Sequence, residues 1–259
     1  MFPVIVQIKG FVIHTYGVFV ALGVLAGIFF ARHEARRLQI NEEKVLDLCF
    51  YIIVAAIVGS RLFYVATHPS YFYSHPLEIF KIWSGGLVFY GGFIASALVV
   101  IAYLRRHNLP LGKTADIAGL SLPLGHFFGR IGCFFAGCCY GQTCKLPWAV
   151  TFSHPESLAP LHTSLHPTQL YHAAGNLLIF LSLFFFRRYK QYDGQIFWLY
   201  IMCYGIIRSA IEILRGDYRG ATIFGIFSLS QVIGICSALI ALAMLIVLSK
   251  RGKSTGNHD

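Results

Sequence analysis

Charged residues are scarce in this sequence, and acidic residues are the scarcest. Of the 259 residues only 12% are charged, with 11 Asp and Glu against 21 Lys and Arg. A soluble domain carries about 25% charged residues, so the composition excludes an ordinary water-soluble globule. Intrinsic disorder is excluded as well, because 56% of the residues are hydrophobic. The class that remains is a polytopic membrane protein.

Signals for export, disulfide scaffolds and metal binding are also missing. The N-terminal segment has no basic start apart from Lys9 and no A-x-A-like cleavage site before residue 30, so we expect it to be mature sequence. The seven cysteines follow no repeating spacing, which argues against a zinc ribbon or a secreted disulfide framework. The sequence therefore predicts neither a metal site nor a cofactor.

Seven apolar stretches are each long enough to cross a bilayer, which takes about 20 helical residues. No internal repeat is visible, and the short loops leave no room for a soluble domain. We expect an all-α integral membrane protein of about seven transmembrane helices, forming a single domain over residues 1–259. The expected spans are 12–31, 45–66, 86–104, 114–137, 168–187, 194–213 and 222–248.

The Lys and Arg residues between the spans predict the orientation, because cytoplasmic loops are enriched in them. Thirteen lie on one side and five on the other, which places the N-terminus outside and the C-terminus in the cytoplasm. The positive charge thus reflects topology, and we expect no binding to nucleic acid. The thirteen are Arg32, Arg36, Arg37, Lys44, Arg105, Arg106, Lys113, Arg187, Arg188, Lys190, Lys250, Arg251 and Lys253, and the five are Lys9, Lys81, Lys145, Arg215 and Arg219.

Three further arginines, Arg61, Arg130 and Arg208, lie inside expected spans. Each costs at least about 2.5 kcal/mol at the centre of a spanning helix. Glu212 is the one acid at comparable depth, and it can pair with Arg208 four residues earlier. The remaining positive charge predicts an anionic ligand, and the planar donor fork of arginine suits phosphate oxygens.

The polar residues of the spans share one depth. All three arginines fall in the outer halves of their spans, and Tyr16, Tyr90 and Gln169 lie at the outer ends of others. A phosphate-bearing lipid of the outer leaflet is the ligand that this level predicts. The alternative to ligand binding is a structural role, in which an arginine extends to the membrane–water interface or binds carbonyl groups at a helix end. This alternative is strongest for Arg61.

Glycines are concentrated around two of the expected spans. Gly125, Gly129, Gly132 and Ala136 follow helical spacing and predict a smooth stripe beside Arg130, where a helix or a lipid chain can approach the backbone. Helix packing alone explains the glycines but not the arginine. The glycine pairs at 85–86 and 91–92 predict unwound backbone that lines a cavity.

These residues resemble the bacterial prolipoprotein diacylglyceryl transferases. The matching motifs occur in order over nearly the whole chain, and together they are specific although each alone is weak. They are His14–Gly17, Gly59–Tyr64, Gly85–Gly92, Gly129–Gly141, His166–Tyr171, Tyr204–Arg215 and Ser230–Gln231.

The resemblance implies a reaction in the bacterial plasma (inner) membrane. A diacylglyceryl group passes from phosphatidylglycerol to the lipobox cysteine thiol of a prolipoprotein signal peptide, giving a thioether and glycerol phosphate. The family's phosphate-binding arginine corresponds to Arg130, and its second essential arginine to Arg208. We expect Arg130, Arg208 and Tyr90 to be catalytic. The expected substrate-binding residues are Arg130, Arg61, Tyr16, Gly129, Gly132, Gly141, Gln169, Tyr204 and Glu212.

This chain departs from the family pattern at several polar positions. Tyr90 replaces the usual histidine, and Cys133, Ala136 and Cys138 replace the usual Asn, Asn and Glu. His172 stands where a Glu normally follows the tyrosine of the fifth span. The pattern predicts a divergent Tyr- and Cys-containing member. The base that accepts the thiol proton stays open among Tyr90, His14, His126 and His166.

The outer cysteines support a competing interpretation. Cys133, Cys138, Cys139 and Cys144 are compatible with a membrane thiol–disulfide oxidoreductase, although no C-x-x-C motif is present. We favour a structural role, either packing or a disulfide from Cys144 to Cys138 or Cys139. A non-catalytic protein that binds or transports anionic lipid is the third interpretation. The acceptor proteins and the oligomeric state are not readable from the sequence.

The predicted topology can be tested with reporter fusions. A reporter fused after residue 40 or after residue 190 is expected to read cytoplasmic, and one fused after residue 150 external, because cytoplasmic loops are the Lys- and Arg-rich ones. An external reading after residue 190 would contradict the seven-span arrangement.

Overall fold

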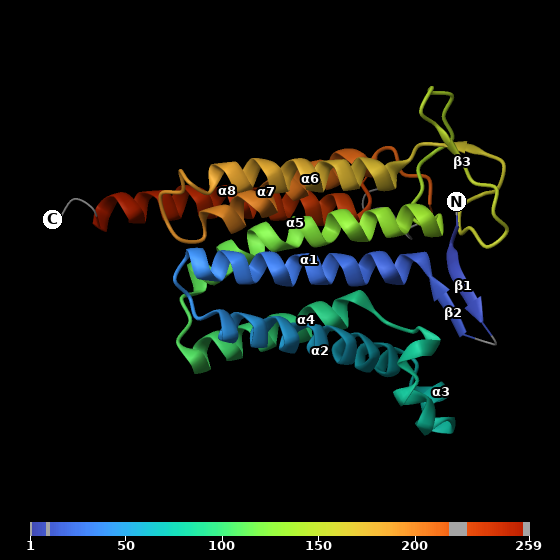
Figure 1. Cartoon of the computed structure of the whole chain (residues 1–259), viewed down its shortest axis with the longest axis horizontal. Helices are drawn as coiled ribbons and strands as arrows, with labels where there is room; N and C mark the ends of the chain where they lie inside the picture. The colour runs from blue at the N-terminus through green and yellow to red at the C-terminus, as the bar shows by residue number, and fades with distance from the viewer. Residues whose placement is uncertain (1, 9–10, 218–226, 256–259) are drawn as a thin grey trace. The chain divides into compact units, whose positions relative to one another are not determined.

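A computed structural model describes residues 2–8, 11–217 and 227–255, and helices make up most of them (Figure 1). The eight α-helices are joined by two 3-10 turns, η1 (Pro76–Phe80) and η2 (Ile82–Ser84), and by two small antiparallel sheets. The helices are α1 (Thr15–Arg37), α2 (Glu42–Thr67), α3 (Pro69–Ser74), α4 (Phe89–His107), α5 (Leu111–Ala136), α6 (Thr168–Phe186), α7 (Gln195–Glu212) and α8 (Leu229–Thr255). The strands are β1 (Val4–Ile8), β2 (Phe11–His14), β3 (Val150–Thr151) and β4 (Ser164–Leu165).

Each of the seven expected spans coincides with a helix, although residues 222–226 of the last lie outside the described residues. Within the described part of the chain, five helices are long and apolar enough to cross a membrane: α1, α2, α4, α6 and residues Leu229–Lys250 of α8. The polar and charged side chains of α5 and α7 lower their hydropathy. An all-α polytopic membrane protein is thus confirmed, and the count of seven spans stays a prediction.

Two segments differ from the expected helices. Residues 12–14, expected to open the first span, belong to β2, which pairs with β1. Both strands are rich in the β-branched residues Val and Ile, which favour a pleated conformation over a helical one. The segment between α2 and α4 is not a plain loop, because α3, η1 and η2 lie there.

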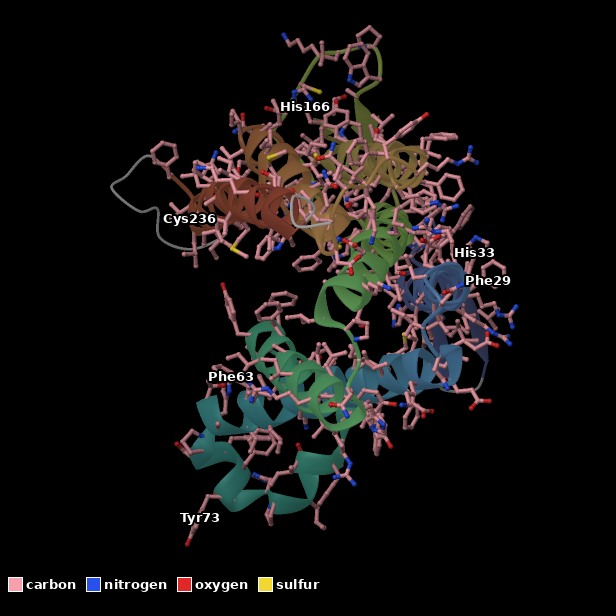
Figure 2. All side chains as sticks on the ribbon, turned by 90° about the vertical axis from the view of Figure 1, so that its left-hand side faces the viewer. Phe29, His33, Phe63, Tyr73, His166 and Cys236 are labelled. Atoms are coloured by element: carbon pink, nitrogen blue, oxygen red, sulfur yellow. The ribbon has the colours of Figure 1, made fainter. Side chains whose placement is uncertain are left out.

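Contacts divide the chain into two compact units, residues 1–31 with 112–259, and residues 32–111. In the first unit, α7 packs along α6 and α8. Its core contains Leu120 of α5, Ile179 and Leu183 of α6, and Ile196 and Tyr200 of α7. Large apolar side chains elsewhere point outward, as Phe29 of α1 does with 75% of its surface exposed (Figure 2). Such an exposed apolar surface is suited to lipid.

The predicted glycine stripe on α5 serves two purposes in the first unit. A Cβ added at Gly132 would lie 3.0 Å from the Cβ of Phe19, and one added at Gly23 of α1 would lie 2.8 Å from the carbonyl oxygen of Gly125. These glycines therefore let α1 approach α5 closely. A Cβ at Gly129 would meet nothing within 4 Å, so open space remains next to Arg130.

In the second unit, α2 and α4 pack closely through glycine. A Cβ added at Gly59 would lie 2.6 Å from the carbonyl oxygen of Gly91. The expectation of unwound backbone is correct at Gly85 and Gly86. Both residues lie outside any helix, and their φ angles of 81° and 67° are positive. It is wrong for residues 91–92, which are buried inside α4 where the two helices touch.

Candidate active site

Arg130 lies on α5, in the part of the helix that follows His126, and is half-buried. Among the residues that the structure describes, none accepts a hydrogen bond from its guanidinium or forms an ion pair with it. The residue before it, Gly129, has open space where a Cβ would lie. An arginine with free donors beside open space is arranged to bind an anion.

Arg208 lies on α7 and makes one weak contact. Its Nη2 donates to Ser230 Oγ at 3.2 Å, at the start of α8. The predicted ion pair with Glu212 is not formed. Glu212 is buried instead against Ser228, whose hydroxyl donates to Oε1 at 3.1 Å, while Oε2 has no hydrogen-bond partner. The acid and the cation thus bond to two different serine hydroxyls near the start of α8.

Arg130 and Arg208 both lie within electrostatic range of the same two histidines. Both guanidinium groups interact electrostatically with His126 of α5 and with His172 of α6. Arg215, three residues after the end of α7, also acts on His172. We call Arg130, Arg208 and Arg215 the arginine centre. It is contributed by α5, α7 and the segment after α7, all within the first unit.

Only one member of the arginine centre has an acidic partner. Arg215 is buried, and its Nε and Nη2 donate to the two carboxylate oxygens of Asp217 at 2.7 and 2.6 Å. Burial opposes its charge, but the hydrogen bonds with Asp217 raise the pKa of Arg215, so this residue stays cationic. Arg130 and Arg208 have no such partner in the described chain, and the predicted excess of positive charge therefore rests on these two.

The histidines of the centre differ in their partners. His126 Nδ1 forms a hydrogen bond with the Tyr200 hydroxyl at 3.0 Å, and its ring lies 5.3 Å from the ring of Tyr204. His172 is fully buried, and neither of its ring nitrogens has a hydrogen-bond partner. Tyr16 of α1 adjoins the same region, because it contacts the Gly132 position and interacts with Arg130.

Gly141 and Gln169 hold the chain that follows α5. Gly141 N donates to His166 O at 3.0 Å, and a Cβ at Gly141 would lie 2.8 Å from the carbonyl oxygens of His166 and Leu214. Gln169, fully buried on α6, donates through Nε2 to Cys138 O at 2.8 Å. Both residues thereby fix the turn beside the arginine centre.

Arg61 and Tyr90 belong to the second unit. Arg61 Nε donates to Ile79 O at 3.0 Å, and its Nη1 donates to Gly85 O at 2.8 Å. Nη1 also reaches Gly86 O, and Nη2 reaches Glu78 O. The guanidinium lies over the rings of Tyr64 and Phe72. Together, these hydrogen bonds and ring contacts give Arg61 a structural role, in which it orders the chain between α2 and α4.

Tyr90 lies in the first turn of α4 and is half-exposed.

The cysteines are arranged differently from the expectation. None of the seven forms a disulfide, so the expected bond from Cys144 to Cys138 or Cys139 is absent. The sulfur atoms of Cys133, Cys138 and Cys139 instead lie within 4.8 Å of one another. We call these three residues the cysteine trio. Its C-x4-C-C spacing matches no common ligand motif, so sequence reasoning missed it.

Comparison with known proteins identifies the family. A family model described as prolipoprotein diacylglyceryl transferase matches residues 3–247. The chain belongs to the prolipoprotein diacylglyceryl transferase family. Among similar proteins are three phosphatidylglycerol–prolipoprotein diacylglyceryl transferases. That of Clostridium tetani is 35% identical over 93% of this chain and 96% of the relative. That of Geobacter sulfurreducens is 31% identical over 96% of each chain. That of Wolbachia from Drosophila simulans is 36% identical over 95% of this chain and 94% of the relative.

Membership in the prolipoprotein diacylglyceryl transferase family confirms the resemblance carried by the ordered motifs, and it makes the chain a transferase. Neither a thiol–disulfide oxidoreductase nor a lipid carrier is favoured by any of these matches.

The contacts of Arg61 predict a defect in folding rather than in chemistry. Arg61→Lys is expected to lower the thermal stability of the purified protein in detergent, because an ammonium cannot reproduce the forked contacts to separate carbonyls. We expect a loss of about 1–3 kcal/mol, from the carbonyl groups left unpaired. Arg105→Lys, at the end of α4 and exposed, is the matched control. A normal melting temperature with reduced substrate binding would contradict the structural role.

Proposed function

We propose that this transferase moves the diacylglyceryl group of phosphatidylglycerol to the lipobox cysteine of prolipoprotein signal peptides. Glycerol phosphate is the second product. The observation that carries the proposal is the pair Arg130 and Arg208, two cations directed at one region of a helical unit without an acidic partner among the described residues. The relatives named above are phosphatidylglycerol–prolipoprotein diacylglyceryl transferases, which gives the anion and the acceptor.

In the proposed reaction, the acceptor sulfur attacks the glycerol carbon that carries the phosphate. A carbon–sulfur bond forms. The bond between that carbon and the oxygen of the phosphate breaks, and its electron pair stays on the phosphate oxygen. Arg130 and Arg208 would stabilise the charge that grows on this oxygen, which is where fixed donors lower a barrier most. Gly129 would leave room for the lipid beside Arg130.

The acceptor thiol must also lose its proton, because a free thiol has a pKa of about 8.5 and the thiolate is the nucleophile. Tyr90 is proposed to orient the headgroup. Of the histidines considered as bases, His126 is engaged with Tyr200, and His166 Nδ1 lies 3.3 Å from the Tyr171 hydroxyl. His172, with two unpartnered ring nitrogens, is a base candidate that the sequence did not single out.

The remaining substrate-binding residues divide by their contacts. We propose that the lipid reaches Arg130 alongside Tyr16, Gly132 and Tyr204. Gly141 and Gln169 shape the turn that follows α5. Glu212 would orient the start of α8 through Ser228. We place the reaction in the bacterial plasma membrane with the site toward the outer leaflet, within one catalytic domain over residues 1–259. The loop charge asymmetry and the depth of the arginines support this placement.

The proposal predicts a large effect of Arg130→Lys, although the charge is kept. A guanidinium can donate two parallel hydrogen bonds to phosphate, and an ammonium cannot. Losing one charge-assisted bond costs about 1.5–3 kcal/mol, which corresponds to a loss of roughly 10- to 150-fold in rate. The measurement is thioether formation on a lipobox peptide with labelled phosphatidylglycerol, followed by mass analysis and normalised to inserted protein.

Arg130→Ala is expected to be slower still, and Arg188→Lys, on an exposed residue of the same unit, is the matched control. Glycerol phosphate must appear in step with the thioether. Near-normal transfer by Arg130→Ala would refute the assignment of the phosphate to α5.

A further inference from the structure

We propose that the cysteine trio is a binding site for a thiophilic metal ion, with Zn²⁺ as the expected occupant. The three thiolates of Cys133, Cys138 and Cys139 would be the protein ligands, and water would take the fourth position. The site adjoins the arginine centre, because Arg130 interacts with Cys133 and His172 with Cys139, but its test reads bound metal and not transfer.

The backbone brings the three sulfur atoms together. Cys133 is in the last turn of α5, and the chain reverses directly after the helix through Gly137, with φ of 75°, and Cys139, with φ of 61°. A left-handed conformation is uncommon for a cysteine and marks a position that the surroundings enforce. The Cys138 thiol contacts the Cys133 carbonyl oxygen at 3.7 Å.

The sulfur separations suit tetrahedral zinc. With zinc–sulfur bonds of about 2.3 Å, the sulfur atoms around one tetrahedral ion lie about 3.8 Å apart. The sulfur atoms of the trio all lie within 4.8 Å of one another. Binding would therefore require the sulfur atoms to approach one another by at most about one ångström.

Buried side chains of α6 fix the turn that carries two of the ligands. Thr168 Oγ1 donates to Cys139 O at 2.7 Å, and Gln169 Nε2 donates to Cys138 O at 2.8 Å. Both side chains are fully buried. Residues that hold the ligand backbone in this way reduce the ordering that metal binding would otherwise require.

The surrounding charges match three thiolates and one divalent ion, which together carry one negative charge. Arg215 interacts with the Cys139 side chain, and Arg130 interacts with Cys133. A set of three sulfur ligands selects soft ions such as Zn²⁺ and Cu⁺ over Mg²⁺ or Ca²⁺.

A second observation points to a bound ligand at this place. His172 is fully buried, lacks any hydrogen-bond partner for its two ring nitrogens, and interacts electrostatically with Cys139. Buried polar groups are rarely left without a partner. A water molecule on the metal would supply the missing hydrogen bond, as expected where three protein ligands leave the fourth position open.

The test is the metal content of the full-length protein purified in detergent from cells grown with zinc. We expect about one zinc ion per chain, as the geometry of a single three-sulfur site requires. Cys133→Ser, Cys138→Ser and Cys139→Ser should each lose most of it. Cys144→Ser is the matched control, because it alters a cysteine close in sequence but outside the trio, and it should keep its zinc.

Cobalt replacement gives an independent spectroscopic readout. After chelation and addition of Co²⁺, the wild type and Cys144→Ser should show thiolate-to-cobalt absorption and the visible bands of a tetrahedral ion, and the trio variants should not. If a serine variant aggregates, wild-type protein treated with a chelator serves as the metal-free sample in its place. The melting temperature should fall on chelation and recover with Zn²⁺.

Three results would overturn the proposal. The first is wild-type protein without bound metal that gains no cobalt–thiolate absorption. The second is a disulfide within the trio in unreduced protein, detected as a mass deficit of two hydrogens. The third is zinc that is lost equally from Cys144→Ser and the trio variants. Copper in place of zinc would refute the assignment of the ion.

Discussion

Two positive charges inside a helical unit, those of Arg130 and Arg208, have no acidic partner among the described residues, and the proposed activity depends on them. A guanidinium at membrane depth is costly and is retained where something compensates it. Arg130 has no partner among the described residues, and Arg208 has one serine hydroxyl. The described residues therefore do not neutralise them, and a phosphate would do so in the proposed function with the geometry that arginine favours. Gly129 leaves the space that such a ligand requires.

Two buried arginines, Arg61 and Arg215, show the opposite arrangement. Arg61 donates its hydrogen bonds to carbonyl oxygens of the chain before α4, and Arg215 is paired with Asp217 through two hydrogen bonds. Four arginines that look alike in a hydropathy plot thus fall into two classes, which are distinguished by what accepts their hydrogen bonds. The classes follow from tertiary contacts, and the composition of the helices does not separate them.

Length and hydropathy were sufficient to predict the helices, because a span needs a fixed number of apolar residues. The ordered motifs were sufficient to predict the family.

The hairpin of β1 and β2 was missed, because its apolar residues continue into α1 without a break in hydropathy. The predicted Arg208–Glu212 pair was wrong, because helical spacing cannot report that Arg208 bonds to Ser230 and Glu212 to Ser228 instead. The cysteine trio escaped because it depends on two left-handed residues in one turn. The roles of Tyr90 and of the remaining substrate-binding residues stay predictions.

The central claim, that Arg130 and Arg208 together hold a lipid phosphate, is tested most directly by the phospholipid that stays bound during purification in mild detergent. The protein would be loaded with equal amounts of phosphatidylglycerol and phosphatidylethanolamine, and the retained lipid would be quantified by mass spectrometry. The account predicts selective retention of phosphatidylglycerol by the wild type and its loss in the double variant Arg130→Gln, Arg208→Gln at an unchanged melting temperature. Equal retention of both lipids by the wild type, or undiminished phosphatidylglycerol in the double variant, would contradict it.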